Sequence, residues 1–178
     1  MISAIRPALM ALCCGLLLGS LYYLLSPRIE TSRKQFETAQ LASVHGLENV
    51  VLEELQSEHY LILDDGQNPV GQVSGAVTLA GYNGRISAWI ATDRLGRILG
   101  VRIRTHRETP GLGDKIDRHI SNWIDLFSGK SLTDPVTRWQ LRRDDGEVDQ
   151  ITGATVTSRA VINMVRESLK ASQQEQPR

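Results

Sequence analysis

A short run of small and hydroxyl-bearing residues, Thr152, Gly153, Ala154 and Thr155, stands directly before a segment with helical periodicity. The segment from about Val156 to Ala171 is predicted to form one amphipathic helix. Its buried stripe is expected to contain Val161, Met164, Val165 and Leu169. Thr155 therefore lies at or next to the N-cap, where unpaired N–H groups and the helix dipole favour an anionic phosphate. The same pattern is also typical of a threonine, Thr152 or Thr155, that simply caps a helix.

A second segment whose residues could bind a ligand joins a predicted strand to a predicted short helix. It runs from His106 to Lys115 and contains the sequence Pro110-Gly111-Leu112-Gly113. Such a tight loop exposes backbone N–H groups, so it is suited to approach a flat polar ring. A Pro-Gly-x-Gly turn is also common where no ligand binds, so this loop alone does not decide a function.

The composition excludes some classes of function. The chain has 178 residues, with 20 Lys+Arg against 20 Asp+Glu. This neutral balance predicts no nucleic-acid partner, because nucleic-acid binding needs a basic patch. No metal site is expected, because the spacing of metal ligands is absent from the four histidines, His45, His59, His106 and His119. The length favours one main domain with a substantial core.

Residues 8–25 carry no charge and are rich in leucine, after a short N-terminal segment of residues 1–7. At about 1.5 Å per residue, a helix of this length would span about 27 Å, close to the hydrocarbon thickness of a bilayer. A cleaved signal peptide is the alternative, but its apolar core is usually about 7–15 residues long. The run Leu21-Tyr22-Tyr23 resembles an interfacial aromatic belt, which favours a retained transmembrane anchor. The basic residues on its two sides do not define an orientation.

The rest of the chain is expected to form three regions. Residues 26–69 are predicted to be a helical juxtamembrane region, with helices over residues 28–42 and 48–55. Residues 70–171 are predicted to form the main domain. The polar tail of residues 172–178 is predicted to be disordered.

The main domain is predicted to be α+β, a twisted antiparallel sheet with helices packed on one side. Leu99, Val101 and Ile103 alternate with polar or small residues, which indicates a half-buried strand. A hairpin turn is expected at Asp93–Arg97, before that strand. Further elements are expected after it: a short helix from Asp114 that carries Ile116 and Ile120, a strand at Trp139–Leu141 and a turn at Asp144–Gly146.

The run from Asp149 to Thr155 resembles the D-x-x-[ST]-G-A-[ST] signature at which a transferase attaches FMN through its phosphate. Together with the His106–Lys115 loop and Gly81-Tyr82-Asn83-Gly84, it resembles the G subunit of the Rnf/Rsx ion-translocating electron transport complex, in the FMN-binding domain family. The resemblance covers nearly the whole chain, with both motifs in the same order and spacing.

This resemblance implies a covalent FMN on Thr155, one per chain, with Asp149 and the Thr152-Gly153-Ala154 turn as the recognition sequence of an FMN transferase. It implies that the flavin is lined by Glu108, Thr109, Leu112 and Gly113. It also implies a bacterial inner-membrane protein with a periplasmic domain, whose partners are the other subunits of a complex that exchanges electrons between ferredoxin and NAD. Such a protein would be a redox relay without catalytic residues of its own.

Other functions remain open from the sequence. The C subunit of the sodium-translocating NADH:quinone reductase is similar in the acceptor motif, although it is generally longer. A membrane-anchored binding module without redox activity could use the same fold, and a free-standing flavin reductase is a third alternative. A hydrolase would use Thr155 or Ser158 as nucleophile with His106 or His119 as base, but no G-x-S-x-G elbow is present.

Overall fold

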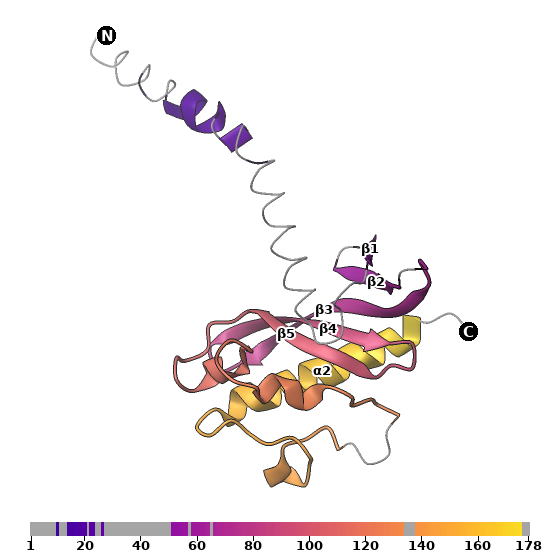
Figure 1. The fold of residues 1–178 in the computed structure, drawn as a ribbon. Helices are drawn as coiled ribbons and strands as arrows, with labels where there is room; N and C mark the ends of the chain where they lie inside the picture. The colour runs from indigo at the N-terminus through magenta and orange to yellow at the C-terminus, as the bar shows by residue number, and fades with distance from the viewer. Residues whose placement is uncertain are drawn as a thin grey trace. The chain divides into compact units, whose positions relative to one another are not determined.

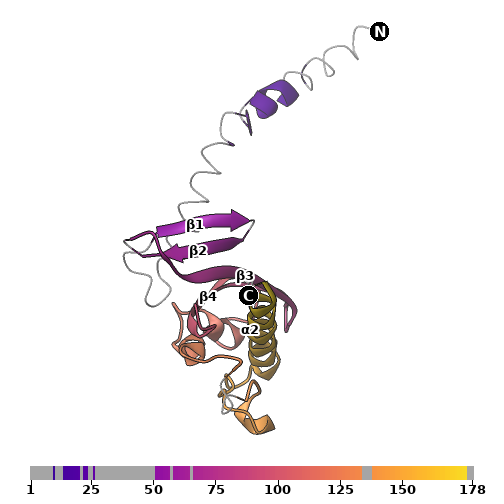
Figure 2. The ribbon, with the colours of Figure 1, turned by 90° about the vertical axis from the view of Figure 1, so that its right-hand side faces the viewer.

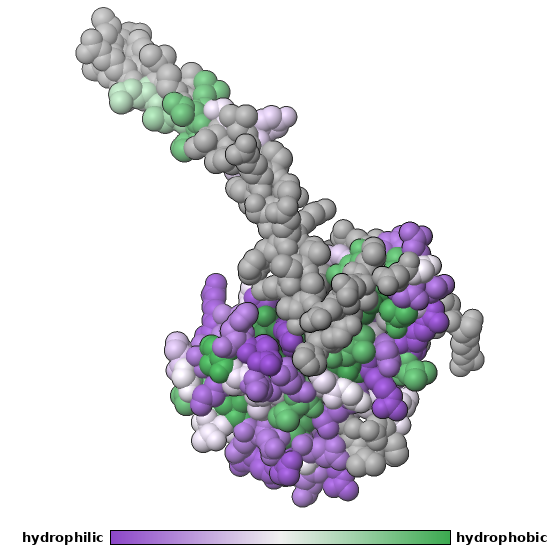
Figure 3. All heavy atoms as spheres, viewed as in Figure 1, coloured by the Kyte–Doolittle hydropathy of each residue, from purple (hydrophilic) through white to green (hydrophobic). Residues whose placement is uncertain are grey.

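The computed structural model describes residues 10, 14–20, 22–23, 26, 51–56, 58–64, 66–133 and 138–175. The chain divides into two compact units, residues 1–40 and residues 41–178. In the first unit, residues 14–20 are helical, and Leu16, Leu17 and Leu18 are exposed and hydrophobic (Figure 3). No helix within the described part of the chain has the length and apolar character needed to cross a membrane. Much of the predicted 8–25 anchor and all of the predicted 28–42 helix lie outside the described residues.

The described part of the second unit is built on a five-stranded sheet whose spatial order follows the chain, β1-β2-β3-β4-β5, with every neighbouring pair antiparallel (Figures 1 and 2). The strands are β1 (Val51–Gln56), β2 (His59–Leu63), β3 (Pro69–Gly81), β4 (Gly84–Asp93) and β5 (Ile98–Thr105). The predicted antiparallel sheet is therefore confirmed. The predicted hairpin turn joins β4 to β5, where Asp93 Oδ1 accepts from the N–H groups of Leu95 and Arg97, both at 2.8 Å.

Helix α2 (Thr155–Glu175) covers one face of the sheet, as both ribbon views show (Figures 1 and 2). The predicted stripe of Val161, Met164, Val165 and Leu169 is buried against that face. Strand β4 is buried on both sides, because Ile86, Ala88 and Ile90 face α2 while the alternate residues Trp89 and Ala91 belong to a second, smaller core. The helix continues past Ala171, so the predicted disorder is wrong for residues 172–175.

The predicted helix over residues 48–55 is wrong, because residues 51–56 form strand β1. The short run of Val51, Leu52 and Leu55 fits both a helical and a strand period, and pairing with β2 decides between them: Leu52 lies opposite Ile62. The sheet therefore begins well before residue 70, inside the region expected to be helical.

Within its described residues, the segment between β5 and α2 contains three short 3-10 helices, η1 (Gly113–Ile116), η2 (Trp123–Phe127) and η3 (Arg142–Asp144). The predicted short helix is thus limited to one turn, and Ile120 lies outside it and is exposed. The predicted strand at residues 139–141 is wrong, since Leu141 makes only an isolated bridge with Val148 among the described residues. The predicted turn that follows is confirmed, with Asp145 at φ 61°.

Candidate functional site

A pocket of about 440 Å³ lies where the turn between β3 and β4, the loop after β5 and the first turn of α2 meet. Its wall is made by Tyr82, Glu108, Thr109, Leu112, Gly113, Gly153, Ala154, Thr155, Val156 and Thr157. Residues of both motifs singled out in the sequence therefore line one pocket. The volume is within the usual range for a small-molecule site, about 300–1,000 Å³.

The turn before α2 is held in place by the buried side chain of Ser158. Its Oγ donates to the carbonyl of Ala154 at 2.9 Å and accepts from the N–H of Ile151 at 3.0 Å. Gly153 adopts φ 80°, and a Cβ at this position would come within 2.9 Å of Leu112 Cδ2. The small residues of the motif are thus required for a positive φ and for close approach of the loop. Ser158 is fully buried and engaged, which disfavours a role as a nucleophile.

Thr155 is the first residue of α2, which confirms its predicted place at the helix start. Its side chain is half-buried at the pocket wall, and Oγ1 donates to Gln150 Oε1 at 3.3 Å. The N–H groups of the first helical turn have no acceptor within the helix. A phosphate on Thr155 would therefore lie beside backbone donors and the positive end of the helix dipole.

Asp149 and Thr152 belong to the same motif but do not line the pocket. Both are exposed, and the Asp149 carboxylate forms an ion pair with Arg142, with Nε 2.8 Å from Oδ1. These two residues are accessible on the surface shortly before Thr155.

Glu108 joins all three walls of the pocket. It is 5% exposed; one carboxylate oxygen accepts from the hydroxyl of Thr157 on α2, and the other accepts from the N–H of Asn83 at 3.1 Å. Gly113 leaves the space that this side chain occupies, because a Cβ there would lie 2.8 Å from Glu108 Cβ. Glu108 lines this pocket and joins the loop to the helix. Its predicted contact with a flavin stays a prediction.

Thr157 is a pocket residue that the sequence motifs do not indicate. A signal was available, since Thr157 stands four residues before Val161 and so lies on the buried stripe of the helix. A buried hydroxyl needs a hydrogen-bond partner, and Glu108 provides it.

The loop after β5 uses much of its own hydrogen-bonding capacity. The N–H groups of Leu112 and Asp114 both donate to the Thr109 carbonyl, at 3.2 and 3.3 Å, and Gly111 N donates to Asp114 Oδ2 at 2.9 Å. These donors are therefore not free for a ligand, in contrast to the expected loop of exposed N–H groups. The loop instead offers the exposed apolar side chain of Leu112, close to those of Tyr82 and Val156.

The chemistry of this pocket suits a flat aromatic group that carries a phosphate. Tyr82, Leu112 and Val156 provide apolar contact for a ring, and the start of α2 provides the donors for an anion. Thr155 places a hydroxyl at the boundary between these two parts.

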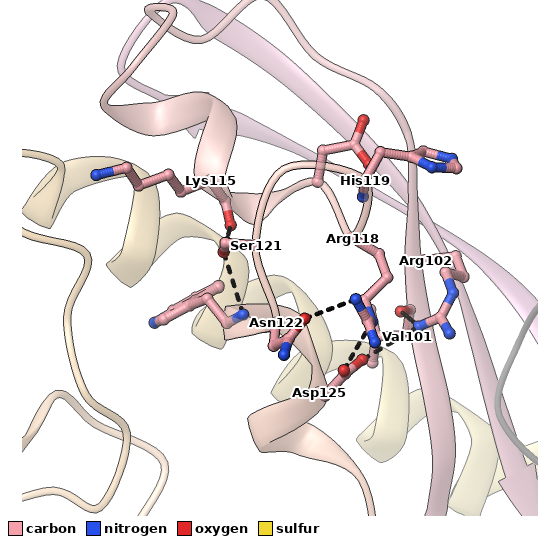
Figure 4. A network of polar contacts seen from close by, with 10 residues as sticks. Val101, Arg102, Lys115, Arg118, His119, Ser121, Asn122 and Asp125 are labelled. Atoms are coloured by element: carbon pink, nitrogen blue, oxygen red, sulfur yellow. Dashed lines mark hydrogen bonds and ion pairs between the residues drawn. The ribbon is translucent and has the colours of Figure 1, made fainter.

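The turn before α2 is also supported from outside the pocket. Trp123 of η2 donates from Nε1 to the carbonyl of Asp149 at 2.6 Å. The segment carrying Trp123 is fixed by a polar network, in which Arg118 Nε binds Asp125 Oδ2 at 2.7 Å and Ser121 Oγ donates to the Lys115 carbonyl at 2.6 Å (Figure 4). Arg102 approaches Asp125 from β5, and burial lowers the pKa of its guanidinium while Asp125 opposes that shift.

Replacing Trp123 by Phe is expected to lower the free energy of unfolding by about 1 kcal/mol beyond the packing loss, because the hydrogen bond to Asp149 disappears. Trp139→Phe is the matched control, since Trp139 Nε1 has no hydrogen-bond partner among the described residues. Urea unfolding of both variants measures the difference. Equal losses would show that the Trp123 N–H does not contribute.

Comparison with known proteins identifies the family. The model of the FMN-binding domain matches residues 81–170. The G subunit of the ion-translocating oxidoreductase complex from Vibrio atlanticus is 41% identical, with 77% of this chain and 75% of that protein covered. The chain belongs to this family of FMN-binding G subunits.

Other G subunits match over a shorter length. That of Photorhabdus laumondii is 47% identical over 60% of this chain, and that of Salmonella typhi is 48% identical over 55%. The match spans about half the length of these two relatives, 51% and 48%. Among solved structures, NqrC of Shewanella oneidensis matches with a TM-score of 0.49 and 23% identity, covering 74% of this chain and 73% of that one.

Proposed function

We propose that this chain carries one FMN, joined through its phosphate to Thr155, and relays electrons within an ion-translocating oxidoreductase complex. The observation that carries the proposal is the position of the Thr155 hydroxyl, at the start of α2 and on the wall of a pocket inside the matched FMN-binding domain. Bound FMN supplies the ability to accept and release electrons. The residues of the chain hold the ring, bind the phosphate and restrict solvent access.

The attachment step needs an external transferase and FAD. Thr155 Oγ1 attacks the FMN phosphorus of FAD and forms a new P–O bond. The pyrophosphate P–O bond breaks, AMP leaves with the bonding electron pair, and the hydroxyl proton passes to a base of the transferase. Asp149 and Thr152 are exposed beside Thr155, which supports their role as the sequence that the transferase contacts.

A covalent bond to the phosphate leaves the ring free to be tuned by the pocket. It also keeps the site occupied where free flavin is scarce, because a dissociable ligand fills its site only above its dissociation constant. This property suits a domain in the periplasm, which is where we place residues 41–178.

Membrane attachment through the N-terminal segment is part of the proposal. Met10, Leu16, Leu17, Leu18, Tyr22 and Tyr23 are all large, hydrophobic and exposed in the described structure. Such a group of side chains is expected to be covered by lipid or by another protein of the complex. A single inner-membrane anchor would then hold the flavin domain beside its complex.

The partners follow from the relatives, several of which are named as the G subunit of an ion-translocating oxidoreductase complex. We infer that the chain assembles with the other subunits of such a complex, between ferredoxin and NAD. The sequence has no G-x-G-x-x-G segment for a dinucleotide, which is consistent with a relay that does not bind NAD itself. Identities of 41–48% to G subunits favour this assignment over a C subunit of the sodium-translocating NADH:quinone reductase.

Intact-mass spectrometry of the full chain, expressed with and without an FMN transferase, tests the proposal. We expect one added FMN phosphoryl group per chain only with the transferase, and a peptide map that places it on Thr155. An unmodified chain under both conditions would refute the covalent assignment. A visible spectrum that stays with the denatured chain provides an independent check.

A further inference from the structure

A second hollow, of about 570 Å³, lies beside the flavin pocket at the same end of the sheet. It is lined by Asn83, Gly84, Arg85, Thr105, His106 and Arg107. The β4–β5 register places Ser87 opposite Thr105, with their hydroxyls 2.8 Å apart, so Arg85 and Arg107 flank this pair where the two strands end. We call this hollow, with its two arginines, the basic hollow.

The described carboxylates do not neutralise the charge of the basic hollow. Arg85 and Arg107 are both exposed, and neither forms an ion pair with a carboxylate in the described part of the chain. Most other described cations do: Arg104, Arg142 and Arg159 lie 2.6, 2.8 and 2.7 Å from carboxylate oxygens. Two neighbouring guanidinium groups of this kind favour an anionic ligand, above all a carboxylate that each can bind with two hydrogen bonds.

Hydrogen bonds link residues of the basic hollow to residues of the flavin pocket. Glu108 N donates to His106 Nδ1 at 3.2 Å, so in the neutral ring the proton resides on Nε2 and makes it a further donor. The side chain of the same residue, the Glu108 carboxylate, forms the wall of the pocket. Asn83 links the two sites again, since it lines the hollow and its Nδ2 donates to Thr109 Oγ1 at 3.3 Å.

Exposed apolar side chains lie next to these charges. Tyr82 is 69% exposed on the turn between β3 and β4, and Leu79, near the end of β3, is 75% exposed. Leu112 is exposed on the facing loop. A hydrophobic centre bordered by charged residues is the usual composition of a protein–protein interface, and steering by charge accelerates docking.

We propose that the basic hollow, together with the exposed apolar side chains of Leu79, Tyr82 and Leu112 beside it, forms the docking surface for the redox partner protein, which presents carboxylate side chains to Arg85 and Arg107. This inference rests on the proposed electron-relay function, because a relay must bring its flavin close to the next redox centre. The hollow lies beside the pocket, so a partner bound there would have its redox centre close to the flavin.

The test uses the full flavin-loaded chain and membranes that contain the rest of the complex but lack this protein. Arg85→Gln combined with Arg107→Gln is expected to weaken binding about tenfold at low salt and to flatten the salt dependence of flavin reduction. Arg94→Gln combined with Arg97→Gln is the matched control, because these arginines occupy the hairpin at the opposite end of β4. We expect this control to bind like the unmodified chain.

Further measurements distinguish failure of the docking surface from failure of the proposed function. Equal binding of the Arg85/Arg107 variant and the unmodified chain would overturn the docking surface. A second contrary result is that the variant loses binding to protein-free phosphatidylglycerol vesicles as strongly as it loses binding to the membranes. That result would identify lipid as the ligand of the two arginines and would also overturn the proposed protein docking surface. Intact mass reports the flavin load of each variant, so a chain that never acquires FMN contradicts the proposed function and not the docking surface.

Discussion

Thr155→Val is expected to fold normally and to carry no covalent flavin when it is produced with an FMN transferase. Valine preserves the shape of threonine but removes the hydroxyl that would become the phosphoester oxygen. The side chain is at the first residue of α2 and makes one exposed hydrogen bond, to Gln150, so the expected stability loss is about 0.5–1 kcal/mol. Intact mass measures the adduct, and thermal unfolding measures stability.

Thr155→Ser is the matched control and should keep the adduct, since it retains a hydroxyl at the same position. Thr157→Val tests a second threonine hydroxyl of the pocket, which is already bonded to Glu108. An adduct that persists in Thr155→Val, or moves to Thr152, would contradict the assignment of the acceptor.

Glu108→Ala is expected to lower the free energy of unfolding by about 3 kcal/mol and to release the loop after β5 from α2. The substitution leaves the buried Thr157 hydroxyl without its acceptor, which costs about 1–3 kcal/mol, and it also removes the acceptor of the part-buried Asn83 N–H. Because the pocket proposed for the flavin lies between these elements, the variant should also bind the ring loosely, with a weaker flavin circular dichroism signal.

Glu108→Gln separates charge from shape. Its amide preserves the length of the side chain and one acceptor oxygen, so we expect a loss of about 1 kcal/mol. Removal of a negative charge from the pocket wall favours the reduced flavin, so the midpoint potential should rise. Glu147→Gln, at the ion pair with Lys130, is the control. An unchanged potential in Glu108→Gln would show that Glu108 acts through geometry alone.

A double-mutant cycle of Glu108→Ala and Thr157→Val measures the bond between the loop and the helix directly. The coupling energy is expected to be about 1.5–3 kcal/mol, as for a buried hydrogen bond to a charged group. Additive effects would show that the two walls are independent.

Local sequence patterns predicted the parts of the site that depend on neighbouring residues. The periodicity of Val161, Met164, Val165 and Leu169 located α2, and the residue before that periodic segment is the observed helix start. The Asp93–Arg97 turn followed in the same way, since its hydrogen bonds stay within five residues. These features are determined by short-range rules, so one sequence is sufficient to find them.

Long-range pairing was not accessible from the same patterns. The contact of Glu108 with Thr157 joins positions 49 residues apart. Strand β1 was mistaken for a helix, because its short apolar run acquires a strand period only when Leu52 pairs with Ile62. The loop after β5 was expected to present its N–H groups outward, yet the Asp114 carboxylate and the Thr109 carbonyl accept several of them.

The sheet is a simple meander, and all five of its described strands precede Thr155 in the chain. The surface against which α2 packs is thus synthesised before α2 itself. Under the proposed function, a transferase that recognises the folded start of α2 would meet Thr155 only after that surface has formed. In that case the amount of flavin attached to each molecule would depend on how fast the domain folds. A slow-folding variant altered far from the site, for example in the β1–β2 hairpin, would reach its mature state with less flavin per molecule although every residue around the flavin is unchanged.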